Sequence, residues 1–202
     1  AKIPVDVRIG KLMILGAIFQ CLDSVLTICA CLSHKSPFVS PFLKRREADA
    51  RKRRFAISNS DHLTVLNAYR KWREQHKKSK NGGKIYADEN FLSQRVLETI
   101  VEMKYQFLEL LVDIGFVHMD ISKSFKGKKI EDNIVEMTGS LLNANSENSR
   151  LIAGILCSSL YPNIVKILTP VTNYVSTISG AMPRQFNGNF EFLFSWKKVK
   201  KF

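Results

Sequence analysis

The longest periodic pattern in the chain runs through residues 87–116, and it limits the fold more than any other feature. Its apolar side chains recur every three or four positions, as they do along one side of an α-helix. They are Phe91, Val96, Leu97, Ile100, Val101, Met103, Phe107, Leu108, Leu110, Leu111 and Ile114. Gly115 then provides a natural end for the helix. We therefore expect one long helix with a buried face.

Two further apolar segments precede this helix. Pro4 suits the first turn of a helix, and from Val7 apolar residues recur at helical spacing as far as Phe19. Asp23 is expected to cap a second helix with its side-chain oxygen, and the face that follows is almost wholly apolar. Consecutive apolar helices predict a mainly α fold built as a helical bundle.

A proline-containing connector and a basic run follow. Two prolines in residues 36–42 exclude a regular helix there. Of the eleven residues 44–54, seven are basic and two are acidic. Alanine and arginine favour a helix, so we expect an exposed basic helix that ends near Phe55. Most of its charges are expected to face solvent or another domain.

Residues 58–78 combine a strong helix start with a basic end. Ser60 or Asn59 can cap the helix, and Asp61 places negative charge in the first turn, where the helix dipole favours it. Trp72 has helical spacing with core positions, which favours a core role over stacking on a base. The segment 78–84 is predicted to be a flexible turn that ends this helix.

Polarity rises after residue 117, and the periodic pattern fades. Residues 117–150 are predicted to form a polar linker or an insertion. A short helix is expected to end at Tyr161, before a strand-like segment over residues 163–168. The tail, residues 186–202, combines an Asn-Gly turn with alternating apolar residues. Both a β-hairpin at a sheet edge and a frayed chain end are consistent with this pattern.

The overall charge indicates a polyanionic partner. The net charge of +13 comes from 31 basic and 18 acidic side chains, and it suits nucleic acid or an anionic membrane surface equally well. The four cysteines lie in apolar segments without paired spacing, which favours buried free thiols in a reducing compartment. Neither cysteines nor histidines have the spacing of metal ligands, and no segment suits a bilayer span or a signal peptide. A cytoplasmic or nuclear location is expected. Membrane contact is not expected, because the basic runs lack a matching exposed apolar face.

The motifs of the common catalytic sites are missing from the sequence. The chain has no G-x-x-x-x-G-K-[ST] phosphate cradle and no matching acidic box, so we expect it not to hydrolyse ATP alone. It also has no G-x-S-x-G or H-E-x-x-H motif. We therefore assign no catalytic residue, no metal and no cofactor to this chain.

Four blocks in a fixed order resemble a known family. They are "IPVDVRIGKLMILGAIFQCLDSVLTICACLSHKSPFVSP", "SDHLTVLNAYRKW", "ENFLSQRVLETIVEMKYQFLELLVDIGF" and "LCSSLYPNIVKI". Together they resemble the C-terminal helicase-associated region of DEAH/DExH-box RNA helicases, over about residues 1–168. The combination is specific, whereas each block alone is weak.

The resemblance implies a modular organisation. Residues 1–20 are similar to the end of a winged-helix domain, 21–116 to the helical ratchet-like bundle, and 151–202 to the start of an OB-like domain with an atypical tail. Residues 117–150 separate these parts. The resemblance thus adds a short, incomplete β (OB-like) part to the mainly α fold, and it suggests a truncated or spliced product.

In this family the region guides single-stranded RNA while separate RecA-like motor domains hydrolyse ATP with Mg. The resemblance therefore implies RNA, the motor domains and an activator protein as partners. The residues expected to contact RNA are Arg70, Lys71, Arg73, Asn90, Arg95 and Lys104. A solvated charged face is the alternative for each of them. The alternative function is a structural and interaction module that clamps the motor domains without major RNA contact.

Overall fold

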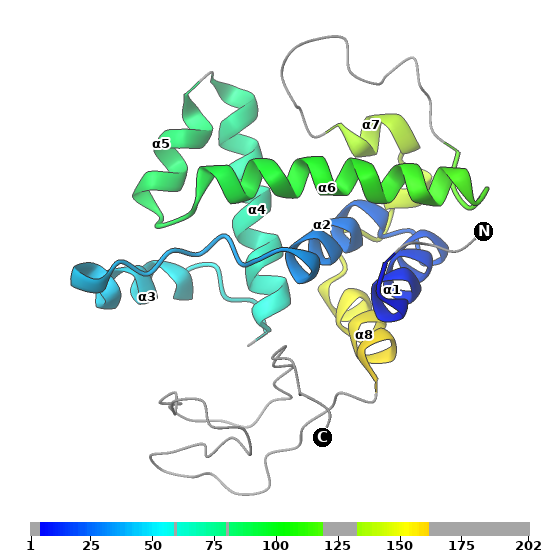
Figure 1. Ribbon diagram of the computed structural model, residues 1–202, viewed down its shortest axis with the longest axis horizontal. Coiled ribbons are helices and arrows are strands. Elements are labelled where there is room, and N and C mark those ends of the chain that lie inside the picture. The colour runs from blue at the N-terminus through cyan, green and yellow to red at the C-terminus, as the bar shows by residue number, and fades with distance from the viewer. Residues whose placement is uncertain (1–4, 59, 80, 119–132, 162–202) are drawn as a thin grey trace, which may run out of the picture.

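The fold is an assembly of helices packed around one core, as the computed structural model in Figure 1 shows. The structure describes residues 5–58, 60–79, 81–118 and 133–161. In these residues the α-helices are α1 (Val7–Ile18), α2 (Leu22–Ser33), α3 (Arg45–Arg53), α4 (Asp61–Lys78), α5 (Gly82–Glu89), α6 (Gln94–Asp113), α7 (Ile134–Thr138) and α8 (Ser149–Leu160). Short 3-10 turns lie at Phe42–Lys44 and Leu141–Asn143. The predicted mainly α bundle is confirmed for this part of the chain.

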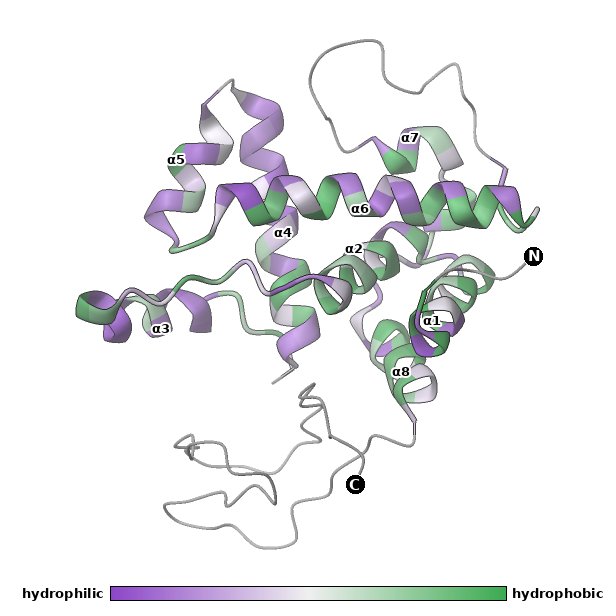
Figure 2. Cartoon of the chain, viewed as in Figure 1, coloured by the Kyte–Doolittle hydropathy of each residue, from purple (hydrophilic) through white to green (hydrophobic). Residues whose placement is uncertain are grey.

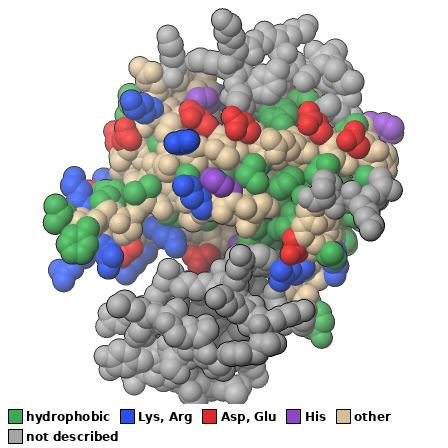
Figure 3. All heavy atoms as spheres, in the orientation of Figure 1, with side chains coloured by type: hydrophobic (Ala, Val, Ile, Leu, Met, Phe, Trp, Pro, Cys, Tyr) green, Lys and Arg blue, Asp and Glu red, His purple; other side chains and the backbone are tan. Residues whose placement is uncertain are grey.

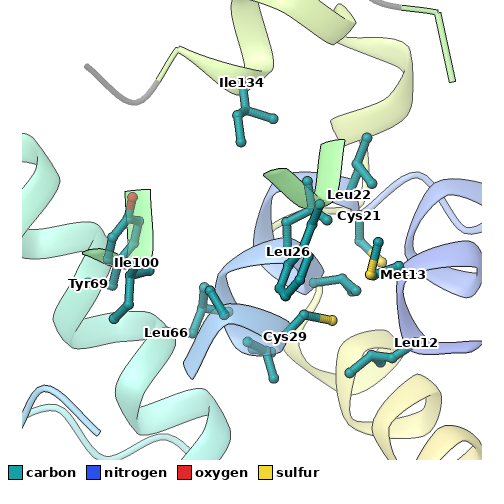
Figure 4. Close-up of a cluster of buried hydrophobic side chains, with 14 of the residues drawn as sticks. Leu12, Met13, Cys21, Leu22, Leu26, Cys29, Leu66, Tyr69, Ile100 and Ile134 are labelled. Carbon is teal, nitrogen blue, oxygen red and sulfur yellow. The ribbon is translucent and has the colours of Figure 1, made fainter. Parts of the chain in front are cut away.

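Helix α2 lies at the centre of the core. Every residue from 21 to 30 is buried, because α2 packs on α1, α4 and α6 together. A helix covered on all sides is mostly apolar, as the largely green colouring of α2 in Figure 2 shows. Figure 4 shows Leu26 of α2 among side chains from the neighbouring helices, including Met13, Leu66 and Ile100. Each such fully buried side chain stabilises the fold by roughly 1.5–3 kcal/mol.

A glycine allows α1 to approach α2 closely. A Cβ atom added at Gly16 would lie 2.7 Å from both Cβ and Cγ1 of Val25. Because Val25 Cβ is fixed by its own backbone, a larger residue would push the two helices apart. On its other side α1 packs on α8, so α1 joins the last described helix to the central one.

The helix starts follow the sequence signals, with one correction. Ser60 caps α4 by accepting from the Leu63 N–H, and Ser93 caps α6 by accepting from the Val96 N–H. The predicted cap at Asp23 is wrong, since α2 begins after Cys21 and no side chain of its own caps it. Asp23 lies two residues past the N-cap position, inside the first turn, and it is only 4% exposed inside the bundle.

The connection between α4 and α6 is more ordered than expected. The segment predicted as a flexible turn leads at once into α5, which packs against α4 as an antiparallel helical hairpin. The long helix begins only at Gln94, because Phe91 adopts a φ of +53° outside it. Gly115, with a φ of +73°, follows its last turn as predicted.

Residues 133–148 differ from the polar connector that the sequence suggested. Helix α7 places Ile134 and Met137 in the core, 0% and 3% exposed. Asn145 donates its backbone N–H to the carbonyl oxygen of Gln20 and its side-chain amide to that of Phe19. Polar residues here bond to the backbone of the bundle, so their abundance does not indicate a loose segment.

Some sequence expectations lie outside the described residues. These are the role of Pro4, the strand-like segment 163–168 and the whole tail with its proposed β structure. Within the described part, Cys21 and Cys29 are buried as expected, and Cys31 and Cys157 are partly so. None of the helices described is both long and apolar enough to cross a membrane.

Candidate nucleic-acid interface

Arg70, one of the predicted RNA contacts, is tied into the protein. Its guanidinium forms an ion pair with Glu147 at 2.9 Å and donates to the Ser24 hydroxyl at 2.8 Å. It also donates to the backbone oxygen of Ser146, which accepts a second bond from the Ser24 hydroxyl. Arg70 therefore holds the segment before α8 against α2 and α4.

Arg73 and Lys104 meet one carboxylate in the interior. Asp23 lies 3.2 Å from an Arg73 guanidinium nitrogen and 2.7 Å from Lys104 Nζ. The Lys104 side chain is 0% exposed, and its ammonium group also lies 4.8 Å from the centre of the Tyr69 ring. A buried charge is tolerated only with opposite charges or ring faces around it, and this cluster supplies both.

These contacts divide the predicted interface into two groups. Arg70, Arg73 and Lys104 join α4 and α6 to α2, and Lys104 is enclosed where a nucleic acid has no access. The sequence signal for this role is the single acid in an otherwise apolar helix, because a buried carboxylate requires cationic partners. Because this acid follows directly on the start of the apolar face, it was interpreted as a helix cap, and the cluster was not predicted.

The remaining candidates, Lys71, Asn90 and Arg95, lie at or near the surface. Lys71 is exposed, with its ammonium group 5.5 Å from the centre of the Phe55 ring. Asn90 is half-buried after the end of α5, where its side-chain amide donates to the Tyr86 carbonyl oxygen. Arg95 is exposed in the first turn of α6, where free backbone N–H groups also favour a phosphate.

Lys71 lies at one end of a projecting segment, and Asn90 and Arg95 flank in sequence the residues that hold its other end. Phe38 and Phe55, whose ring centres lie 5.9 Å apart, close its base. Lys71 contacts the Phe55 end, while residues 91–93 hold the Phe38 end through the Val39 N–H to Phe91 oxygen bond and the Ser93 N–H to Pro37 oxygen bond. We call the segment between the two rings, residues 39–54, the basic arm.

Trp72 belongs to the core, as its spacing predicted. Its side chain is 1% exposed, and its indole N–H donates to the Gln94 side chain at 2.8 Å. The ring stacks on His76 with 4.9 Å between ring centres. This tryptophan therefore fixes the start of α6 against α4 and is covered by protein on its faces.

Comparison with known proteins identifies the family. The family described as "Helicase associated domain (HA2), ratchet-like" matches residues 6–65, from the start of α1 into α4. The RNA helicase DHX57 of Mus musculus is 47% identical over 191 residues, which cover 92% of this chain. The chain belongs to the DEAH/DExH-box helicase family, in its C-terminal helicase-associated region.

Other members of the family agree with this placement. The ATP-dependent DNA/RNA helicase DHX36 of Homo sapiens is 42% identical over 168 residues, 83% of this chain. The DExH-box ATP-dependent RNA helicase DExH1 of Arabidopsis thaliana is 42% identical over 167 residues, 81% of this chain. The chain spans only 14% of DHX57 and 15% of the other two proteins.

Several exposed cations of this helicase-associated region lie close together on the basic arm. Lys44, Arg45, Arg46, Arg53 and Arg54 are all exposed. Among the described residues none of these five forms an ion pair, in contrast to Lys52, which is bonded to Asp61 at 3.0 Å. Figure 3 shows blue side chains around α3 and green ones at its outer tip.

Proposed function

We propose that this chain is the RNA-guiding accessory region of an ATP-dependent DExH-box RNA helicase. Its exposed cations bind single-stranded RNA, while separate RecA-like motor domains of the parent protein bind ATP and Mg and hydrolyse the nucleotide. The family placement supports this proposal, and so does the surface position of Lys71 and Arg95 on two packed helices of the bundle. The motor domains and an activator protein are the further partners that we propose.

The observation that carries the proposal is the division of the cations. The internal cluster fixes α4 and α6 on α2, and the same two helices present Lys71 and Arg95 outward. A cation on a rigid helix loses less conformational freedom when it binds a phosphate than one on a loose chain. The internal arginines and the buried lysine thus act as positioning residues for the outer contacts.

The test is RNA binding by the double variant Lys71→Gln, Arg95→Gln. Binding of a fluorescein-labelled oligouridylate is measured by anisotropy between about 50 and 200 mM salt. If both residues neutralise phosphates, the slope of log affinity against log salt becomes shallower by about 1.4, since each contact on a single strand contributes about 0.7.

The charge-matched control is the double variant Lys84→Gln, Arg150→Gln, which removes two exposed cations from α5 and α8. The control is expected to keep nearly the full slope. Equal slopes for the wild type and the Lys71, Arg95 variant would contradict the proposed contacts.

The second candidate function is a structural module that clamps the motor domains. The observation in its favour is the internal use of Arg70, Arg73 and Lys104, which join helices and leave fewer cations for RNA. The same titration decides between the two functions. A wild-type chain that does not bind the oligouridylate even at low salt would favour the clamp.

A further inference from the structure

The basic arm exposes large apolar side chains beside its cations. Phe42 is 86% exposed and Leu43 is 92% exposed, at the 3-10 turn that precedes α3. Isolated exposed apolar residues are common, but two adjacent ones among exposed cations form a candidate contact surface.

The arm is held in place at its base. The Phe38 and Phe55 rings are in contact, and Lys52 reaches back from α3 to Asp61 and to a position 5.4 Å from the centre of the Phe38 ring. Ala48, 5% exposed, is the buried position of α3. The projecting cations are therefore attached to a fixed helix.

The outward face of α3 carries cations at a regular spacing. At 100° per residue, Arg46 and Arg53 lie on the side of the helix opposite Ala48, two turns and about 10 Å apart along the axis. Arg45 and Arg54 flank this face. Seven basic and two acidic residues over positions 44–54 give this segment a surplus of five positive charges out of the net +13.

We propose that the basic arm is a second contact for single-stranded RNA, in which Phe42 stacks on a base and Arg46 and Arg53 neutralise phosphates. This inference rests on the proposed function, because the arm begins beside Lys71 and beside Ser93, which lies two positions before Arg95 in sequence. An aromatic ring among cations is the combination that binds single strands without sequence preference. A protein partner would instead use both apolar residues of the tip.

The experiment compares three variants of the 202-residue chain with the wild type in the oligouridylate titration. Arg46→Gln, Arg53→Gln is expected to make the salt slope shallower by about 1.4. Phe42→Ala is expected to weaken binding about tenfold with little change in the slope, since stacking involves no phosphate. Leu43→Ala is the matched control, equally exposed but without an aromatic face, and it should change affinity less than about twofold.

Several outcomes would overturn the inference. In the first, the arm variants bind as tightly as the wild type while the Lys71, Arg95 variant loses affinity. This result leaves the proposed function intact. A second is an equal loss of slope in the Lys84, Arg150 control, because binding would then follow net charge alone. A third is an equal effect of Phe42→Ala and Leu43→Ala, which indicates general apolar contact. If the wild type does not bind, the proposed function fails first and the inference with it.

Discussion

At the scale of single residues, the carboxylate of Asp23 determines what two cations do. It is buried between Arg73 and Lys104, and the backbone N–H of the same residue donates to the side chain of Asn143. A buried ion pair adds little net stability compared with apolar residues, but removal of one partner leaves an uncompensated charge. The cluster therefore acts mainly by specifying which helices meet.

We expect Lys104→Met to destabilise the chain by about 3 kcal/mol, because Asp23 then keeps only the partly exposed Arg73 as its cationic partner. Methionine retains the apolar stem of lysine, so loss of packing contributes little. The free energy of unfolding is measured by urea titration followed by circular dichroism. Lys84→Met, at an exposed position, is the control and should change stability by less than about 0.5 kcal/mol.

The double variant Asp23→Asn, Lys104→Met separates charge from shape. Neutralising the carboxylate removes the unpaired charge, so we expect part of the lost stability to return. Two results would contradict this account of the cluster. One is a Lys104→Met variant as stable as the wild type. The other is a double variant whose loss of unfolding free energy equals the sum of the losses from the two single changes.

At the scale of elements, the hairpin of α4 and α5 depends on its two glycines. A Cβ atom at Gly83 would lie 2.6 Å from Nδ1 of His76, and that ring is already stacked on Trp72. A Cβ atom at Gly82 would lie 2.4 Å from the backbone oxygen of Gln75. The close approach of the two helices therefore excludes side chains at this corner.

We expect Gly83→Ala to destabilise the chain by about 1–3 kcal/mol, because His76 has to move from its stack. At a helical position with free space around it, a glycine-to-alanine substitution is expected to stabilise the chain, since alanine favours the helix by about 1 kcal/mol over glycine. Gly154 in α8 is such a position, with nothing within 4 Å of the added atom, so Gly154→Ala should stabilise slightly. The melting temperatures of both variants test this prediction. A shift in the same direction for both would refute the steric explanation.

Local signals predicted the elements well, because helix caps and apolar spacing act within one segment. Ser60 and Gly115 are examples, and each lies where the sequence placed it. Asp23 was misassigned because its partners are 50 and 81 residues away in sequence. The candidate site was only partly predicted for the same reason. The sequence shows which residues are cationic, but tertiary contacts decide whether each cation faces the interior or the solvent.

At the scale of the whole molecule, the segment 133–148 joins the end of the described chain to its beginning. The backbone N–H of Asp23 donates to Asn143 Oδ1 at 2.9 Å, so a residue 120 positions away supplies the oxygen that α2 lacks at its own start. The Asn143 amide also donates to Thr138 and to the Gly139 carbonyl oxygen. Because α8 follows this segment and packs on α1, the described parts share one network.

We expect Asn143→Ala to lower the free energy of unfolding by about 1–2 kcal/mol, as loss of a helix cap and of its further bonds does. The effect should also reach beyond the site, because α8 is held to the bundle partly through this segment. Hydrogen exchange is therefore expected to quicken in α8 as well as at the start of α2. Ser140→Ala, at an exposed position nearby, is the control and should leave both regions unchanged. Faster exchange confined to residues 139–145, with α8 protected as in the wild type, would show that the segment only covers the bundle and does not connect its two ends.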